Sequence, residues 1–235
     1  MKKLRRRIFC FPGLGADARM YRDLHFEKVE KVALDWIVPL PQESLSAYVV
    51  RVLQPFDPQP EDIMLGVSFG GPAALEASRA VGDAPVVFIS TLKLEQERPV
   101  YFSFFQRVPL HQWLPARWIK RLGTIVPPPQ RAGIRREEYD LFLDMVHATD
   151  NTFMRWALHQ ILHWKNQVLP HRYVHLHGDR DLLFPIDRIR NPIIIRRGTH
   201  FMIVRQAQLI HAHVQSFIDE LPEASQSEPP YDQPA

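Results

Sequence analysis

The sequence predicts an α/β protein with a doubly wound, mostly parallel sheet of about six strands. Short runs rich in valine and isoleucine recur along the chain with almost no polar alternation, as is typical of parallel strands buried on both faces. Helical patterns separate most of these runs, and strand–helix–strand repetition favours a parallel sheet with right-handed crossovers. The expected strands cover residues 7–12, 31–38, 62–67, 84–90, 172–178 and 191–197.

Apolar residues at helical spacing mark several helices between these strands. The clearest lie near residues 18–25, 44–54 and 70–81. A final apolar stripe covers 201–220 and predicts an amphipathic helix that packs on the sheet.

One connection is much longer than the others. About 80 residues separate the fourth strand from the fifth, far more than an ordinary crossover needs. Aromatic, proline-rich and helical stretches follow one another in this segment, so we expect a helical lid or cap inserted at 92–170 within a single domain of 1–220. Residues 221–235 lack apolar side chains that could pack, which predicts a disordered tail.

The length and charge of the chain narrow the class of protein. Its 235 residues are 46% hydrophobic and 23% charged, which suits one soluble globular domain. The 29 basic and 26 acidic residues are spread out, which argues against a nucleic-acid partner, because such partners need a concentrated basic face. No stretch is long enough to span a bilayer, and the apolar run after the basic start ends at Pro12, too early for a secretory signal. We expect a cytoplasmic protein, and these observations disfavour action at a membrane surface.

Cysteine and histidine usage argues against a metal site. The single cysteine, Cys10, forms no internal disulfide and excludes a zinc site built on several thiolates. His159 and His163 have the spacing of two ligands on a helix, but no Glu stands in a His-Glu-x-x-His arrangement and no third ligand is evident. His175 and His177 share one face of the fifth strand, and we expect them to be structural or surface residues. We therefore expect no metal and no cofactor.

The most informative stretch is IMLGVSFGGPAALEASR, residues 63–79, which places Ser68 between Gly66 and Gly70. Turns favour glycine and serine, so these residues alone also fit a simple turn. A serine in Gly-x-Ser-x-Gly between a strand and a helix is, however, the pattern of a nucleophile elbow, in which a strained backbone exposes the hydroxyl. Side chains at 66 and 70 would collide with the neighbouring strand or helix, and Gly71 gives further room. The helix start also supplies N–H groups and a dipole for developing negative charge.

Partners for Ser68 follow later strands in the order that such an elbow requires. Asp179 and Asp181 end the fifth strand in HLHGDRDLLFP, and His200 follows the sixth strand in RRGTHFMIV. Because the carboxyl ends of parallel strands meet at one edge of a sheet, we expect these side chains to lie together. His200 would take the Ser68 proton and later protonate the leaving group, while an acid would orient the imidazole and stabilise its charged form.

With these motifs the chain resembles the α/β-hydrolase superfamily over nearly its whole length, to about residue 220. The resemblance rests on FPGLGAD, GVSFGG, HGDRDLLFP and GTHFMIV. In that family the acid stands three residues after the glycine that ends its strand, here Gly178, which favours Asp181 over Asp179. Family members usually have two strands before the first one found here, so the resemblance implies an α/β-hydrolase fold lacking the first two strands.

The resemblance also implies an oxyanion hole. In this family one N–H comes from the residue after the nucleophile and one from the loop after the first strand, which here implies the backbone N–H groups of Phe69 and Leu14. Gly13 and Gly15 let that loop bend around the site. Pro12 replaces the histidine that often begins this loop, which keeps the N–H donors and removes one side-chain contact.

These features predict a metal-independent serine hydrolase that cleaves a carboxylic ester or thioester through an acyl-Ser68 intermediate. The partner is then a small-molecule substrate with an apolar acyl part. A non-catalytic ligand-binding protein on the same fold, a lyase or amidase that reuses the triad, and a membrane-surface lipase remain alternatives. Aromatic side chains of the lid either line the pocket or pack on the sheet: Tyr101, Phe102, Phe104, Phe105, Trp113 and Trp118. Basic residues among them either face solvent or bind a substrate anion: Arg107, Arg117, Lys120 and Arg121.

Overall fold

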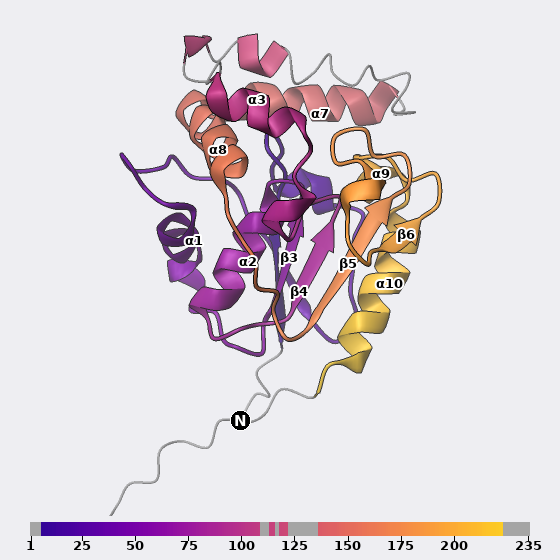
Figure 1. Cartoon of the computed structure of the whole chain (residues 1–235). Helices are drawn as coiled ribbons and strands as arrows, with labels where there is room; N and C mark the ends of the chain where they lie inside the picture. The colour runs from indigo at the N-terminus through magenta and orange to yellow at the C-terminus, as the bar shows by residue number, and fades with distance from the viewer. Residues whose placement is uncertain (1–5, 109–112, 116–117, 122–135, 223–235) are drawn as a thin grey trace, which may run out of the picture.

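A six-stranded sheet in the order β2-β1-β3-β4-β5-β6 forms the centre of the molecule, and every neighbouring pair of strands is parallel (Figure 1). The structure, a computed structural model, describes residues 6–108, 113–115, 118–121 and 136–222. The strands are β1 (Arg7–Phe11), β2 (Glu30–Ala33), β3 (Ile63–Val67), β4 (Val86–Ile89), β5 (Tyr173–Gly178) and β6 (Ile193–Ile195).

Helices connect the strands and cover both faces of the sheet. The α-helices are α1 (Leu45–Leu53), α2 (Gly70–Ala80), α3 (Tyr101–Arg107), α7 (Arg136–Ala148), α8 (Asn151–His163), α9 (Met202–Arg205) and α10 (Ala207–Glu220). Short 3-10 turns are η1 (Ala18–Tyr21), η2 (Gln54–Phe56), η3 (Glu95–Glu97) and η4 (Ile186–Arg188).

Two hydrophobic cores lie on the two sides of the sheet. Phe9 and Phe11 of β1 pack in the core that contains α1 and α2, whereas Ile8 and Cys10 pack in the core that contains α10. This division follows from the alternation of side chains along a strand. Figure 1 shows α1 and α2 on one side of the strands and α10 on the other. Helices on both faces of a parallel sheet confirm the predicted doubly wound α/β class.

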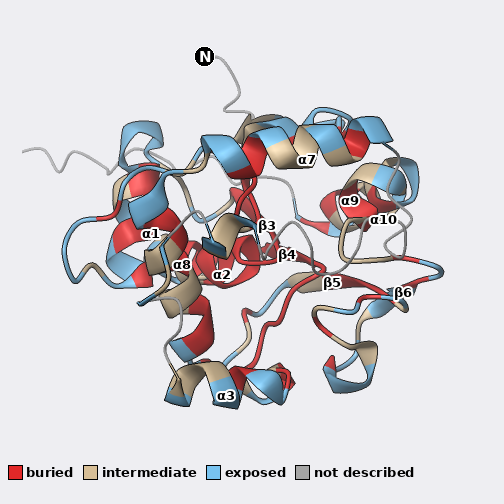
Figure 2. Cartoon of the chain, turned by 90° about the horizontal axis from the view of Figure 1, so that it is seen from above, coloured by how far each residue is buried: buried red, intermediate tan, exposed pale blue. Residues whose placement is uncertain are grey.

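The helices α3, α7 and α8 lie beyond the carboxyl ends of the strands (Figure 1). Seen along the strands, α3 and α7 lie on opposite sides of the ends of β3 and β4, with α8 and α9 completing a frame around them (Figure 2). All three helices come from the segment expected to form the lid, of which residues 109–112, 116–117 and 122–135 lie outside the described residues. Residues 223–235 of the expected tail also lie outside them.

The edge strands depart from the expected pattern. In β6, Ile193 and Ile194 are 40% and 50% exposed, because this strand has a neighbour on one side alone. At the other edge β2 ends at Ala33, several residues short of the expected strand. Beyond it the chain turns toward the site, where the Asp35 carboxylate accepts from the Ala18 N–H at 3.0 Å and Trp36 Nε1 donates to a backbone carbonyl. A continuous apolar run in the sequence therefore predicts a strand but does not tell an edge strand, such as β6, from a central one.

Two of the expected helices differ from the structure. The pattern near 18–25 forms η1 alone, held by a 2.5 Å hydrogen bond from the buried Tyr21 hydroxyl to the Phe11 carbonyl. The stripe at 201–220 is divided at Gln206 into α9 and α10. Gln206 leaves helical geometry, with φ −119° and ψ 33°, and its side chain donates to the Arg196 carbonyl at 2.9 Å. None of the helices in the described part of the chain is both long and apolar enough to cross a bilayer.

Candidate active site

Ser68 lies between β3 and α2 in a strained backbone conformation. Its φ is +54°, a left-handed value that a non-glycine residue rarely adopts. The flanking glycines allow the turn because a β-carbon at Gly66 would lie 2.0 Å from the Gly70 carbonyl oxygen, and one at Gly70 would lie 2.0 Å from the Phe11 carbonyl oxygen. Both obstacles are backbone atoms, so no side-chain movement would relieve them. The local geometry is that of a nucleophile elbow.

Thr91, just after β4, anchors this elbow and was not predicted from the sequence. Its buried hydroxyl donates to the Ser68 carbonyl at 2.5 Å, and the Ser68 N–H donates to the Ile89 carbonyl at 3.1 Å. Gly71 is the residue that makes room for Thr91, since a β-carbon there would lie 2.2 Å from the Thr91 hydroxyl oxygen. The one sequence signal for this role was the place of Thr91 at the end of the strand beside β3.

Ser68, His200 and Asp181 form one continuous chain of hydrogen bonds. His200 Nε2 lies 2.9 Å from Ser68 Oγ, and His200 Nδ1 lies 2.9 Å from Asp181 Oδ2. Because an ionised carboxylate only accepts, Nδ1 carries the hydrogen and Nε2 is left to accept from the serine hydroxyl. The structure thus brings together three side chains that follow three different strands, β3, β5 and β6.

The acid of this chain is buried and ionised. Asp181 is 4% exposed, and its Oδ1 accepts the backbone N–H groups of Leu183 at 2.8 Å and Phe184 at 2.9 Å. Burial acts to raise the pKa of Asp181, but the charge and hydrogen bond of His200, with smaller contributions from His177 and the Phe184 N–H, outweigh it. The pKa of Asp181 therefore lies below its ordinary value, and the carboxylate is charged at neutral pH.

Asp181, and not Asp179, occupies the position beside His200. The Asp179 N–H donates to the Ile195 carbonyl at 3.2 Å, which ties the turn to β6. Its Oδ1 is buried and has no hydrogen-bond partner among the described residues. The contact of Asp179 with this turn is therefore made by its backbone.

The loop after β1 lies directly against Ser68. A β-carbon at Gly13 would lie 3.4 Å from Ser68 Cβ, so the loop backbone contacts the elbow. The Gly13 carbonyl is held by Trp36 Nε1 at 3.2 Å and by the Ala16 N–H at 3.1 Å. Gly15 takes a φ of +76°, and a β-carbon there would lie 3.1 Å from the Val146 side chain of α7. The loop is thus fixed between the elbow below and the lid helix above.

The two expected oxyanion donors lie at the same place. Leu14 comes from this loop and Phe69 directly follows Ser68, and both line the cavity that contains Ser68. Phe69 stands at the N-terminal end of α2, where backbone N–H groups lack helical partners. The position agrees with the expected role, which stays a prediction.

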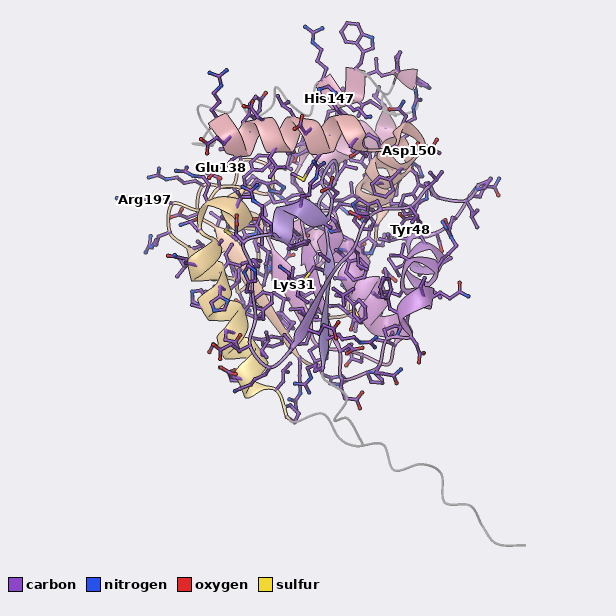
Figure 3. The ribbon with its side chains drawn as sticks, turned by 180° about the vertical axis from the view of Figure 1, so that it is seen from behind. Lys31, Tyr48, Glu138, His147, Asp150 and Arg197 are labelled. Carbon is purple, nitrogen blue, oxygen red and sulfur yellow. The ribbon has the colours of Figure 1, made fainter. Side chains whose placement is uncertain are left out.

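A cavity of about 610 Å³ opens over Ser68 and His200. This volume lies within the range of small-molecule sites, which are mostly apolar with a few polar groups. Figure 3 shows α7 crossing above the sheet, with Glu138 near one end of the helix and His147 toward the other. Hydrophobic walls come from Phe102 and Phe105 of α3, from Leu141, Phe142, Met145 and Val146 of α7, and from Met154, Leu158, Ile161 and Leu162 of α8.

Three of the six aromatic residues expected to line the pocket or pack on the sheet do line the cavity, whereas the other three are exposed and fill neither role. Tyr101, Phe102 and Phe105 line the cavity, and the Tyr101 hydroxyl donates to the Leu183 carbonyl at 2.6 Å. Phe104, Trp113 and Trp118 are 56%, 68% and 47% exposed, and Tyr101 is itself 38% exposed at the cavity rim.

The basic residues of the lid divide in a similar way. Lys120 lines the cavity and donates to the carbonyls of His147 at 3.2 Å and Thr149 at 2.6 Å, at the end of α7. Arg121 lies over the Trp118 ring at 5.9 Å. Arg117 lies outside the described residues.

Cys10 and the two histidines of α8 are weaker candidates for a nucleophile or for metal ligands. Burial raises the pKa of Cys10 to about 12, so this thiol is protonated at neutral pH. The rings of His159 and His163 have centroids 4.2 Å apart on α8. Within the described ranges, no group of three histidine, cysteine, aspartate or glutamate side chains is arranged to hold a metal ion.

Comparison by sequence finds no matching family model and no matching curated protein. Comparison by structure finds many solved proteins with this architecture. A hydrolase from Pseudomonas aeruginosa PA01 has a TM-score of 0.72 at 13% identity, over 91% of this chain and 90% of that one. An esterase (EaEST) from Exiguobacterium antarcticum has a TM-score of 0.69 at 11% identity, over 92% of each chain. A bromoperoxidase from Bacillus anthracis has a TM-score of 0.68 at 13% identity, also over 92% of each.

The chain therefore has the α/β-hydrolase fold, as the sequence motifs implied. The similarity covers more than nine tenths of the chain. At these identities it establishes the fold, whereas the chemistry has to be argued from the site itself.

Proposed function

We propose that the protein is a metal-independent serine hydrolase that cleaves a carboxylic ester or thioester through an acyl-Ser68 intermediate. The observation that carries the proposal is the unbroken chain from Ser68 Oγ to His200 to Asp181, with both links at 2.9 Å, beneath an apolar cavity. A strained serine, a histidine in the accepting tautomer and a buried carboxylate are the parts that nucleophilic acyl transfer requires.

The proposed reaction has two halves. Ser68 Oγ attacks the carbonyl carbon while its proton passes to His200 Nε2, and Asp181 stabilises the imidazolium that forms. The negative oxygen of the tetrahedral intermediate accepts from the N–H groups of Leu14 and Phe69. The bond to the alkoxide or thiolate then breaks, and His200 protonates the leaving group.

Water completes the cycle in the second half. It gives a proton to His200 Nε2 as its oxygen attacks the acyl carbon of acyl-Ser68. Collapse of this second intermediate breaks the bond to Ser68 Oγ, releases the carboxylic acid and returns the proton to the serine. No step in this scheme requires a group beyond the residues named and water.

The cavity lining supports an apolar acyl group as the part of the substrate that the site holds. Its walls above Ser68 are aliphatic and aromatic side chains, among them Phe102, Leu158 and Ile161. Such surfaces gain about 0.8 kcal/mol for each methylene that they remove from water. Neighbours of this fold include a hydrolase and an esterase, which is consistent with ester chemistry.

Replacing the nucleophile tests this proposal. We expect Ser68→Ala to lower kcat on p-nitrophenyl butyrate by a factor on the order of 10⁴ or more. Ser46→Ala, at an exposed serine of α1, serves as the matched control and should behave like the wild type. A fluorophosphonate probe should label the wild-type protein at Ser68 and leave Ser68→Ala unlabelled. Wild-type turnover by purified Ser68→Ala would exclude the acyl-Ser68 mechanism.

A matched pair of substrates separates ester from thioester preference. Butyryl esters and butyryl thioesters share the acyl group and differ in the leaving atom, so their ratio of kcat/KM reports the leaving-group side of the site. A butyryl amide included in the same series tests the amidase alternative.

A further inference from the structure

A second histidine, His177, is buried beneath the proposed triad. It belongs to β5, four residues before Asp181, and is 0% exposed. Its Nε2 lies 2.8 Å from the Phe184 carbonyl oxygen. A carbonyl only accepts, so Nε2 carries the hydrogen and donates it. Its Nδ1 is buried without a hydrogen-bond partner among the described residues, which leaves the bond to Phe184 as the polar anchor of the ring.

Phe184, the residue that His177 holds, contacts both His200 and Asp181. Its backbone N–H donates to Asp181 Oδ1 at 2.9 Å. Its ring meets the His200 imidazole edge to face, with centroids 5.4 Å apart and an interplanar angle of 66°. Phe184 therefore helps to hold the carboxylate through its backbone, together with the Leu183 N–H, and contacts the imidazole through its side chain.

We propose that His177 is a positioning residue, which keeps Asp181 and His200 aligned by fixing the backbone of Phe184. The inference rests on the proposed serine-hydrolase function and extends it to a residue that does not touch substrate. Without the bond from His177, the Phe184 carbonyl would be buried and unsatisfied, and the loop from 181 to 184 would relax to find another donor. Both contacts of Phe184 with the triad would shift with it.

The charge state of His177 suits this role. The groups that face it are Asp181, whose Oδ2 lies 3.6 Å from Nε2, and then His200, His175 and Glu97. Burial lowers the pKa of His177, against the opposing effects of Asp181 and of the Phe184 carbonyl. A neutral His177 ring donates to the Phe184 carbonyl and carries no charge that would attract Asp181, so the Asp181 carboxylate interacts mainly with His200. A protonated ring would compete with His200 for that charge.

His175 provides a matched control for burial and chemistry. It lies two residues earlier on the same face of β5, is 2% exposed, and packs against the Phe88 ring at a centroid distance of 5.9 Å. Its Nδ1 lies 3.1 Å from Lys93 Nζ, which also forms a buried ion pair with Glu97 at 2.7 Å. Its ring also meets the His177 ring edge to face, with centroids 5.4 Å apart, but its polar contact is with Lys93 and not with Phe184.

The test compares His177→Leu with His177→Gln and His175→Leu. Leucine removes the donor, whereas glutamine places an amide N–H where it can reach the Phe184 carbonyl. We expect His177→Leu to lower kcat on a short soluble ester about 10- to 100-fold with KM little changed, because misalignment acts on the chemical step. His177→Gln should recover kcat to within about threefold of the wild type. His175→Leu should lower the melting temperature and leave kcat within the same limit.

Two readouts separate positioning from general destabilisation. In His177→Leu the acid limb of the kcat/KM profile should move, because the hydrogen bond that helps to lower the pKa of Asp181 becomes less stable. The downfield proton resonance of the His200–Asp181 hydrogen bond should weaken or broaden in His177→Leu, and it should persist in His177→Gln and His175→Leu. This NMR signal does not depend on turnover, so it still tests the inference if Ser68→Ala shows that the proposed function is wrong.

Three results would overturn the inference. They are unchanged kcat in folded His177→Leu, equal losses in the leucine and glutamine variants, and an equal loss in His175→Leu. If His177→Leu does not fold, His177→Asn takes its place, since its amide is one methylene too short to reach the carbonyl. The proposal then requires a loss of kcat in the asparagine variant that the glutamine variant does not show.

Discussion

Leu158 of α8 offers a way to test whether the cavity holds the acyl group. It lines the cavity from the lid side and is partly buried. A tryptophan in its place would occupy part of the space above Ser68, whereas Thr152 is an exposed position at the start of the same helix. Leu158→Trp and Thr152→Trp therefore make the same chemical change inside and outside the cavity.

The size of the effect follows from the cavity. Its volume of about 610 Å³ holds about 20 groups of the size of a water molecule, at roughly 30 Å³ each. That is enough for an eight-carbon acyl chain with an aromatic leaving group. Extending acetyl to octanoyl adds six methylenes at about 0.8 kcal/mol each, so kcat/KM should rise by at most a factor of about 3,000. Partial solvation of the chain will reduce this gain, and we expect an increase of at least about 30-fold.

The assay is kcat/KM for a series of p-nitrophenyl esters from acetyl to dodecanoyl, kept below their critical micelle concentrations. In the wild type the value should rise with chain length and then level off when the cavity is full. Leu158→Trp should lower the octanoyl value by at least about tenfold and the acetyl value much less, because a two-carbon group leaves the far end of the cavity empty. Thr152→Trp should reproduce the wild-type series. A wild-type series that is flat or falling from acetyl to hexanoyl would refute the assignment of the cavity to the acyl group.

Two further predictions concern the elbow and the acid. Gly70→Ala should reduce the free energy of unfolding by about 3 kcal/mol or more, because the new β-carbon would lie 2.0 Å from the Phe11 carbonyl oxygen. Urea denaturation measures this loss, with Gly13→Ala as the control, because the atom nearest to a β-carbon there is 3.4 Å away. Equal stability of the two variants would contradict the prediction. The folded pKa of Asp181 lies below its ordinary value, so its carboxylate stabilises the fold above that value and the contribution is lost as pH falls through the folded pKa. Asp181→Asn should therefore lose less stability than the wild type between pH 5 and pH 3, and parallel losses would show that the carboxylate is not coupled to folding.

Local sequence patterns were sufficient to point to the residues of the candidate site that depend on short spacing. The glycines around Ser68, the position of Asp181 after Gly178 and the place of His200 after the last strand can all be recognised within a few residues. The strand runs were equally clear, because burial on both faces leaves a continuous apolar stretch. These features led to the fold class, and the structural comparisons confirm it.

Contacts between distant residues were not predictable in the same way. Thr91 reaches the Ser68 carbonyl across 23 positions of sequence, and nothing in its own neighbourhood distinguishes it from other threonines after strands. The sequence predicts only that His177 is a structural or surface residue. Its hydrogen bond to Phe184 depends on the conformation of the loop after β5, which the sequence does not specify. The break at Gln206 was missed because the apolar stripe continues across it, while a side-chain bond to Arg196 decides the geometry.

The carbonyl oxygen at the end of β1 connects the elbow to the middle of the sheet. The Phe11 oxygen accepts the buried hydroxyl of Tyr21 and also sets the limit on any side chain at Gly70. Since β1 pairs with β2 on one side and β3 on the other, neither contact can yield without disturbing the central strands. Ser68 is thereby fixed to a central strand of the sheet, while most of the cavity walls belong to the separate helices α3, α7 and α8. Substitutions in these helices can therefore change the shape of the cavity without moving the turn that carries Ser68.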